Sequence, residues 1–332
     1  MSEDSSSAAL TTASDDAGGS TVASWWSFYD SDTGAFQYAV IVMGIVGAAA
    51  NALILYAMVA AKQHKKQFLI LNQNAFDLCS SLLLVITYTI QMCKIRLTGT
   101  LVYFVCIMFL TKSLLWCSII GSTINLLSIT VERYIKVVHP NRSKKLLRKW
   151  VRWSAAAFAW IGAIVYEMAL VISTSNLSDK RCIAYRMWLS ETAALVHGFW
   201  NFGSFYAIVI FIFLFCYGKI LVVIRRQARV MAGHSGPRSS TSQTQSSHIQ
   251  SNVIKTMIIV SALYVILWTP NYIYFLLLHF KTDLIVTVHH IGTFLGFFYI
   301  SANPFIYALK FHPVRRILVG LIPWKRSEEA SG

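Results

Sequence analysis

The chain has 332 residues, of which 56% are hydrophobic and only 13% are charged. Soluble domains carry about 25% charged residues, so this composition argues against a soluble enzyme and against a disordered chain. The formal net charge of +15 raises the question of nucleic-acid binding, which the positions of the charges must answer. Six cysteines without a CxxC pair argue against a disulfide scaffold and against a zinc site.

Long apolar segments dominate the chain. A membrane-spanning helix needs roughly 20 mostly apolar residues. Seven segments meet this requirement, at about 37–61, 68–91, 101–131, 153–173, 192–224, 253–279 and 284–309. The sequence therefore predicts an all-α membrane protein, with a seven-transmembrane helix bundle over 37–309 and its termini on opposite sides of the membrane.

The basic residues indicate the orientation of this bundle. Residues 1–61 contain no Lys or Arg, whereas most of the 29 basic residues follow spans one, three, five and seven. Because cytosolic loops are enriched in Lys and Arg, we expect an extracellular N-terminus and a cytosolic C-terminus in the plasma membrane. The positive charge is then a topology signal, and we expect the lipid bilayer, not nucleic acid, as a partner. Asn176 lies in an Asn-Leu-Ser sequon on the predicted outside, where it can be glycosylated.

Three segments outside the spans have distinct compositions. Residues 1–36 are rich in Ser, Ala, Thr and Asp and are predicted to be disordered, as a solubilising tail or as an acidic lure for a basic ligand. The polar stretch at about 226–252 is predicted to be a flexible cytosolic loop. Residues 310–332 are predicted to form a short amphipathic helix on the inner leaflet, beginning near Pro313, and a short tail.

Polar side chains occur at mid-membrane depth. Asp77 lies in span two, and Asn51, Ser122 and Asn303 lie in spans one, three and seven. A charged group at this depth is costly and usually faces an internal cavity. One interpretation is a set of unrelated interhelical hydrogen bonds. The other is a single polar core that holds a hydrated monovalent cation or a proton.

Short motifs fall at corresponding depths of successive spans. They are Asn51 in AANALIL, Asp77 in NQNAFDL, Glu132-Arg133-Tyr134, Trp160, Tyr217 in CYGKI, Trp268 and Pro270 in LWTP, and Asn303 to Tyr307 in NPFIY. On these residues the chain resembles the rhodopsin-like (class A) G-protein-coupled receptors over residues 37–324. The resemblance implies a receptor, without enzymatic activity, that binds an extracellular ligand and activates a heterotrimeric G protein.

The resemblance also assigns roles to the motif residues. In the family, the arginine matching Arg133 is held inward at rest and released to contact the G protein, with Tyr217 and Tyr307 bonding around it in the active state. Prolines inside helices remove a hydrogen bond and kink them. A kink at Pro270 therefore lets span six swing outward after a small shift near the ligand. The activation and coupling residues implied are Glu132, Arg133, Tyr134, Tyr217, Trp268, Pro270, Asn303, Pro304 and Tyr307.

Partners and ions follow from the same resemblance. Besides the G protein, the family interacts with arrestins and receptor kinases. Family members also suggest a sodium ion near Asp77, with Asn51, Ser122 and Asn303 around it; no other metal is expected. Trp268, one turn above the kink, is either an ordinary packed aromatic residue or part of the switch.

The sequence departs from the family pattern around this core. Gln73 and Asn74 are polar where the family usually has Leu and Ala, and Tyr299 stands where an Asn often helps to bind sodium. These substitutions put the sodium site in doubt. Span five contains no proline, so we expect its usual bulge to be missing.

The cytosolic side departs as well. No Asp or Glu lies between Glu191 and Asp283. Arg133 therefore cannot pair with an acid on span six, and we expect a weak resting lock with appreciable ligand-free signalling.

An extracellular disulfide is implied between Cys182 and the outer end of span three. Cys106 is the favoured partner, although it lies two residues further from Arg133 than usual, and Cys93 is the alternative. Either span three contains an irregularity or the bridge is displaced.

The ligand is constrained mainly by exclusion. Phe297 stands at the retinal lysine of opsins, which rules out covalent retinal, and Leu115 stands at the Asp of amine receptors. Lys112 is so deep that it needs a counter-ion, for which Glu167 is available, or an anionic ligand. A peptide or small anionic ligand is therefore preferred. The pocket residues expected are Lys112, Leu115, Trp116, Glu167, His197, Asn201, Asn271, Tyr272, His289, His290, Thr293 and Phe297.

The alternative is a seven-helix transporter or another non-receptor membrane protein. A transporter is expected to show inverted repeats and broken helix pairs, which the sequence lacks. HExxH and GxSxG motifs of membrane enzymes are also missing.

Overall fold

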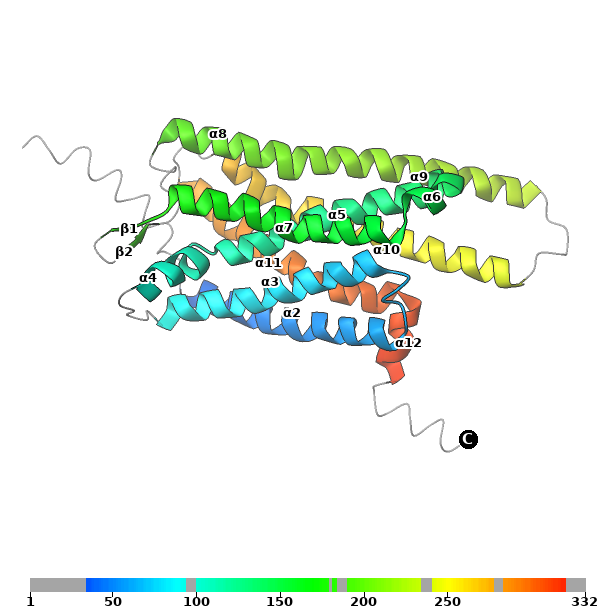
Figure 1. Cartoon of the computed structure of the whole chain (residues 1–332), viewed down its shortest axis with the longest axis horizontal. Coiled ribbons are helices and arrows are strands. Elements are labelled where there is room, and N and C mark those ends of the chain that lie inside the picture. The colour runs from blue at the N-terminus through cyan, green and yellow to red at the C-terminus, as the bar shows by residue number, and fades with distance from the viewer. Residues whose placement is uncertain are drawn as a thin grey trace, which may run out of the picture.

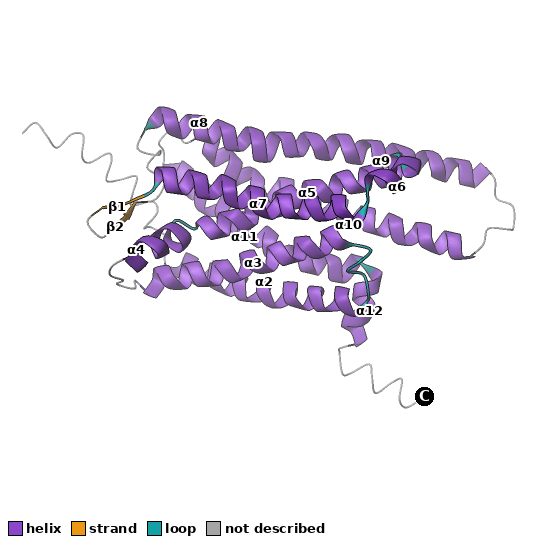
Figure 2. Ribbon diagram, in the orientation of Figure 1, coloured by secondary structure: helices purple, strands orange, loops and turns teal. Residues whose placement is uncertain are grey.

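The computed structural model describes residues 34–93, 100–178, 181–183, 190–233, 241–277 and 283–320. Long helices lie side by side in one bundle (Figure 1), and nearly all of the described chain is helical (Figure 2). Within these residues, seven helical segments are long and apolar enough to cross a membrane. The predicted all-α, seven-span architecture is therefore confirmed.

The elements follow the chain without rearrangement. They are α2 (Gly34–Ala60), α3 (Phe68–Cys93), α4 (Thr100–Val105), the π-helical turn η1 (Cys106–Leu110), α5 (Ser113–Val138), α6 (Pro140–Leu146), α7 (Lys149–Thr174), β1 (Asn176–Ser178), β2 (Arg181–Ile183), α8 (Glu191–Phe202), the π-helical turn η3 (Gly203–Ala207), α9 (Ile208–Gly233), α10 (Thr241–Leu277), α11 (Asp283–Lys310) and α12 (His312–Gly320). Strands β1 and β2 form an antiparallel hairpin in which Leu177 pairs with Cys182.

The two ends of the bundle carry different elements. Helices α6 and α12 lie at one end, here called the α6 end, and α4 and the hairpin lie at the other, here called the hairpin end (Figure 1). Large apolar side chains face outward, as with Phe211 (69% exposed) and Leu214 (71% exposed). Such an apolar exterior is stable in lipid, where the backbone hydrogen bonds of helices are closed internally.

Span three is interrupted near the hairpin end. The π-helical turn η1 is followed by Thr111 and by Lys112, whose φ of 60° is left-handed, before α5 begins. Side chains take up the carbonyls that the break leaves open: Thr111 Oγ1 donates to the carbonyl of Ile107 at 2.6 Å, and Ser113 Oγ donates to it at 2.5 Å. The irregularity that the offset of Cys106 allowed is therefore present.

Span five also contains a π-helical turn, and the expectation of a missing bulge was wrong. The turn η3 forms at Gly203–Ala207 without a proline. A π-turn leaves a carbonyl without its usual helical partner. Tyr264 of α10 supplies one by donating its hydroxyl to the carbonyl of Phe205 at 2.7 Å. A side chain from the neighbouring helix thus stabilises the bulge.

The polar stretch expected to be a flexible loop at 226–252 is largely helical. Helix α9 continues to Gly233 and α10 already begins at Thr241. The helix breakers Gly233, Gly236 and Pro237 are confined to the short interval between them, and the Ser, Thr and Gln residues beyond tolerate a helix. The first helix begins at Gly34, three residues earlier than expected, and α12 lies where the amphipathic helix was expected. The predicted disordered segment up to residue 33 and the tail from residue 321 lie outside the described residues.

Candidate functional site

Arg133 is buried at the α6 end of α5, with 4% of its surface exposed. Its Nη2 donates a hydrogen bond to Oε1 of Gln67, just before α3, and lies 3.4 Å from Oε2 of Glu132. Glu132 is shared, because its Oε1 lies 2.7 Å from Nζ of Lys136. The arginine is therefore restrained by one neutral amide and half of one carboxylate. Gln67 was not singled out from the sequence, since it lies in no motif.

Two tyrosines were expected near this arginine. Tyr217 Oη lies 3.1 Å from both Thr130 Oγ1 and Ser261 Oγ, so it links α9 to α5 and α10. Tyr307 is 1% exposed, and its hydroxyl has no hydrogen-bond partner among the described residues. The hydrogen bonds of Tyr217 thus go to Thr130 and Ser261 and not to Arg133, and the state described is one in which Arg133 is retracted.

Trp268 lies against α11 at the middle of the bundle. Its ring is 6.4 Å from that of Trp116 and 6.2 Å from that of Tyr272, between centroids. A Cβ atom at Gly296 of α11 would lie 3.0 Å from two atoms of the Trp268 ring, so the glycine permits this close approach. Pro270 follows two residues later inside α10. The aromatic residue and the expected hinge therefore share one helical turn.

The polar core is centred on Asp77, which is fully buried. Its Oδ1 accepts hydrogen bonds from Ser122 Oγ at 3.1 Å and Gln73 Nε2 at 3.4 Å. Its Oδ2 accepts one from Asn303 Nδ2 at 2.9 Å. The structure thus brings Asp77, Ser122 and Asn303 together.

Asn51 is placed differently from the rest of the predicted core. Its Nδ2 donates to the carbonyl of Gly47 at 3.0 Å and to the carbonyl of Ile300 at 3.5 Å. These bonds tie α2 to α11, and they follow the interpretation of an isolated interhelical contact.

Lys112 is the buried cation of the hairpin end, with 7% of its surface exposed. Its Nζ donates to Tyr88 Oη at 3.0 Å and lies 4.5 Å from the centre of that ring. The left-handed backbone at Lys112 follows directly after η1, so the interruption of span three determines where this side chain lies. Leu115 is fully buried one turn further along.

The comparisons with known proteins bear on this arrangement. Residues 50–307 match the family described as 7 transmembrane receptor (rhodopsin family). The chain belongs to this family. It is accordingly a rhodopsin-like, multi-pass membrane receptor, as the sequence motifs predicted.

Individual relatives of this receptor are distant. It is 26% identical over 209 residues to neuropeptide FF receptor 1 of Rattus norvegicus, covering 57% of this chain and 48% of the relative. It is 24% identical over 234 residues to lysophosphatidic acid receptor 1-A of Xenopus laevis, covering 67% and 58%. The chain thus spans about half the length of the curated relatives it matches.

A solved structure shows the same fold. The crystal structure of squid rhodopsin aligns with a TM-score of 0.70 at 16% identity, covering 87% of this receptor and 85% of that chain. At this identity the likeness concerns the fold alone.

Other residues expected around the ligand pocket pair locally. On α8, Asn201 Nδ2 lies 2.9 Å from Nε2 of His197 and also donates to the His197 carbonyl at 3.0 Å. Tyr272 stacks on Tyr206 with ring centres 4.8 Å apart, and His290 meets Phe36 edge-on at 5.5 Å. These contacts show that the receptor uses several expected ligand residues for interhelical packing.

Some polar atoms of this region remain unsatisfied. Asn271 Oδ1, Thr293 Oγ1, His289 Nδ1 and Trp268 Nε1 are buried without hydrogen-bond partners among the described residues. Buried polar groups are usually hydrogen-bonded, so each of these atoms is available to a ligand. The other expected pocket residues, Glu167 and Phe297, are also buried.

The cysteines of this receptor distinguish the alternatives for the disulfide. Cys106 is disulfide-bonded, whereas Cys93 is a free thiol. The side chain of Cys182 lies outside the described residues, as does that of Asn176, the predicted glycosylation site. In the part of the chain that is described, no group of three or more His, Cys, Asp or Glu residues could hold a metal ion.

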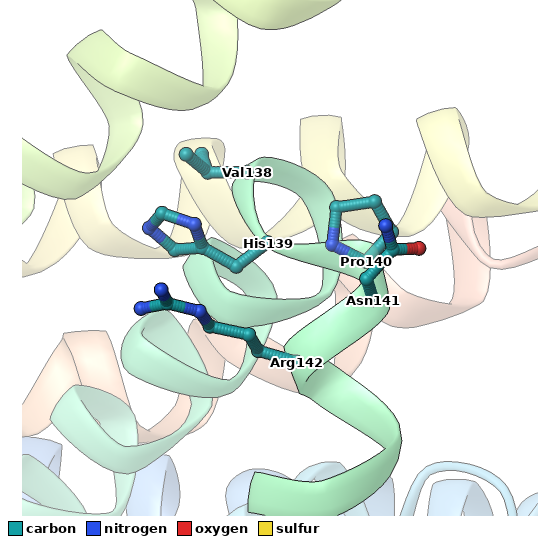
Figure 3. A pocket seen from close by; sticks show the side chains of 5 residues that line it. All are labelled: Val138, His139, Pro140, Asn141 and Arg142. Atoms are coloured by element: carbon teal, nitrogen blue, oxygen red, sulfur yellow. The ribbon is translucent and has the colours of Figure 1, made fainter.

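A surface hollow lies at the junction of α5 and α6. Val138, His139, Pro140, Asn141 and Arg142 line its volume of about 230 Å³ (Figure 3). His139 and Arg142 extend to the same side of the chain in this view. Tyr134 Oη lies 3.4 Å from His139 Nε2, so the third member of the Glu-Arg-Tyr motif contacts the wall of the hollow.

Proposed function

We propose that this receptor binds an extracellular ligand in the hairpin half of the bundle and activates a heterotrimeric G protein at the α6 end. The observation that carries the proposal is the position of Arg133. It is buried against Gln67 and Glu132, and α10 offers no acidic residue to hold it. Few contacts need to break before the arginine can reach a partner.

Outward movement of α10 would connect the two ends. A proline inside a helix is a natural bending point, and Pro270 lies next to the packed Trp268. The swing would break the bond between Tyr217 and Ser261, which links α9 to α10. The unsatisfied hydroxyl of Tyr307 would then be available to bind a rearranged partner.

The α6 end is suited to an acidic partner. Lys144, Lys145 and Arg148 are exposed around it. The same charge bias supports a cytosolic location for this end and for the C-terminus, with the N-terminus outside. Arrestins and receptor kinases would use the same basic rim after activation.

An anionic or peptide ligand fits the hairpin half best. Lys112 supplies a buried positive charge, and Asn271, Thr293 and His289 present unsatisfied polar atoms. A carboxylate or phosphate group would combine an ionic contact with hydrogen bonds there. The names of the relatives, one for lysophosphatidic acid and one for a neuropeptide, are compatible with both ligand classes.

Guanine-nucleotide exchange tests the coupling without a known ligand. The purified receptor is reconstituted in lipid vesicles with a panel of heterotrimers, and uptake of a non-hydrolysable GTP analogue is followed. We expect faster uptake with at least one heterotrimer than with empty vesicles, and loss of this acceleration in Arg133→Ala. Equal rates across the panel, or an unaffected Arg133→Ala variant, would refute the proposal.

A further inference from the structure

A chain of side-chain amides crosses the middle of the bundle and ends on Asp77. Trp160 Nε1 donates to Asn72 Oδ1 at 3.0 Å, and Asn72 Nδ2 donates to Asn125 Oδ1 at 2.9 Å. Asn125 Nδ2 then donates to Gln73 Oε1 at 2.8 Å. Each amide thus accepts from the preceding residue and donates to the next.

The first member determines the direction of the whole chain. An indole N–H can only donate, so it must face the oxygen of Asn72. The nitrogen of Asn72 is then left to face Asn125, and the same reasoning continues to Gln73. The orientation of an amide that would otherwise be ambiguous is therefore set by a donor on α7.

As a result, the nitrogen end of Gln73 faces the carboxylate. Gln73 Nε2 donates to Asp77 Oδ1 at 3.4 Å and also to Ser122 Oγ. With Ser122 and Asn303, three side chains now donate to the two oxygens of Asp77. All three donors and the carboxylate are buried.

The residues present do not fit the sodium ion that the family suggests. Hard cations take oxygen ligands. Here the position between Asp77 and Ser122 is taken by an amide nitrogen that has no lone pair to offer. Tyr299, one turn before Asn303 on α11, adds a large buried ring where a small amide would leave space.

We propose that Gln73 replaces the cation at Asp77. Its N–H groups bridge Asp77 and Ser122 as a bound ion would, and Asn125, Asn72 and Trp160 hold them there. The receptor therefore carries an uncharged, built-in substitute for sodium. Its stability does not depend on this ion.

Thermal unfolding of the purified receptor tests the proposal without a ligand or a G protein. Unfolding is measured in sodium chloride and in N-methylglucamine chloride at equal ionic strength. We expect equal midpoints for the wild type. In Gln73→Leu, and more strongly in Gln73→Leu combined with Tyr299→Asn, we expect a saturable, sodium-specific rise of about 3 °C, because only a folded-state ligand raises the midpoint.

Asn74→Leu is the matched control. Asn74 is the adjacent polar residue of α3, but it donates to the carbonyl of Ile70 at 2.9 Å and does not contact Asp77. This variant should stay insensitive to sodium. A sodium-specific rise in the wild type that Asp77→Asn abolishes would overturn the proposal. So would the lack of any sodium effect in both Gln73 variants, since Gln73 would then not be the group that excludes the ion.

Discussion

Arg133 and Gln67 are joined by a hydrogen bond from the guanidinium Nη2 to the amide Oε1. The arginine at the α6 end of α5 is therefore held towards the start of α3. The absence of acids from α10 led us to expect a weak resting lock. The structure adds which neutral group provides the restraint.

Removing this amide should increase ligand-free signalling. In Gln67→Ala, Arg133 keeps only the shared Glu132, and a hydrogen bond to a charged group is worth about 1.5 kcal/mol, roughly tenfold in the resting-to-active ratio. We expect higher basal nucleotide exchange in membranes at equal receptor density. Gln63→Ala is the control, because Gln63 donates to the carbonyl of Ala61 within the same loop. Unchanged basal exchange in Gln67→Ala would show that this bond does not restrain the receptor.

The link between α9 and α10 should act in the same direction. Ser261→Ala removes one of the two hydroxyls that bind Tyr217, so the outward movement of α10 loses an opposing contact. We expect a rise of about threefold to tenfold in basal exchange, the range of one neutral hydrogen bond. Thr256→Ala serves as control, since Thr256 bonds only within its own helix, to the carbonyl of Asn252. A lower basal rate in Ser261→Ala would contradict the assigned role.

Gly121→Ala should destabilise the bundle. The added Cβ would lie 2.3 Å from Cε1 of Phe76. The Phe76 ring stacks on Trp160 at 3.8 Å between centroids, so it has little room to retreat. Overpacking of this kind costs about 1–3 kcal/mol, which should lower the unfolding midpoint by several degrees. Gly162→Ala, whose Cβ would meet nothing closer than 3.8 Å, should unfold within a degree or so of the wild type, and equal losses in both variants would refute the packing argument.

Lys112 allows its backbone and its side chain to be separated. Both Lys112→Gly and Lys112→Ala remove the contact with Tyr88, but only glycine adopts a φ of 60° without strain. We therefore expect Lys112→Gly to be more stable than Lys112→Ala by about 1 kcal/mol. The unfolding midpoints of the two purified variants report the difference. A higher midpoint for alanine would mean that the left-handed conformation is absent in solution.

The sequence predicted the parts of the receptor that depend on local pattern. The lengths of the apolar segments gave the seven spans, and the Pro residues of α10 and α11 marked the expected bends. Asp77, Ser122 and Asn303 were grouped because a buried carboxylate needs partners at the same depth. The structure places these three residues in contact.

Features that depend on contacts between helices escaped the sequence. The turn η3 is stabilised by the hydroxyl of Tyr264 from α10, which no pattern within span five reveals. Asn125 and Gln67 lie in no motif, and their roles arise only when α5 packs against the start of α3. The continuation of α9 and α10 was missed because a polar composition was taken to indicate a loop.

The distance between α3 and α10 at the α6 end tests the central claim most directly. Spin labels at the exposed Lys65 and Lys255 report it, and labels at Lys65 and Arg142 provide a reference pair. On binding of the nucleotide-free heterotrimer that the exchange assay selects, we predict a longer Lys65–Lys255 distance and an unchanged Lys65–Arg142 distance. If the Lys65–Lys255 distance stays the same while the heterotrimer is bound, α10 does not open and the account is contradicted.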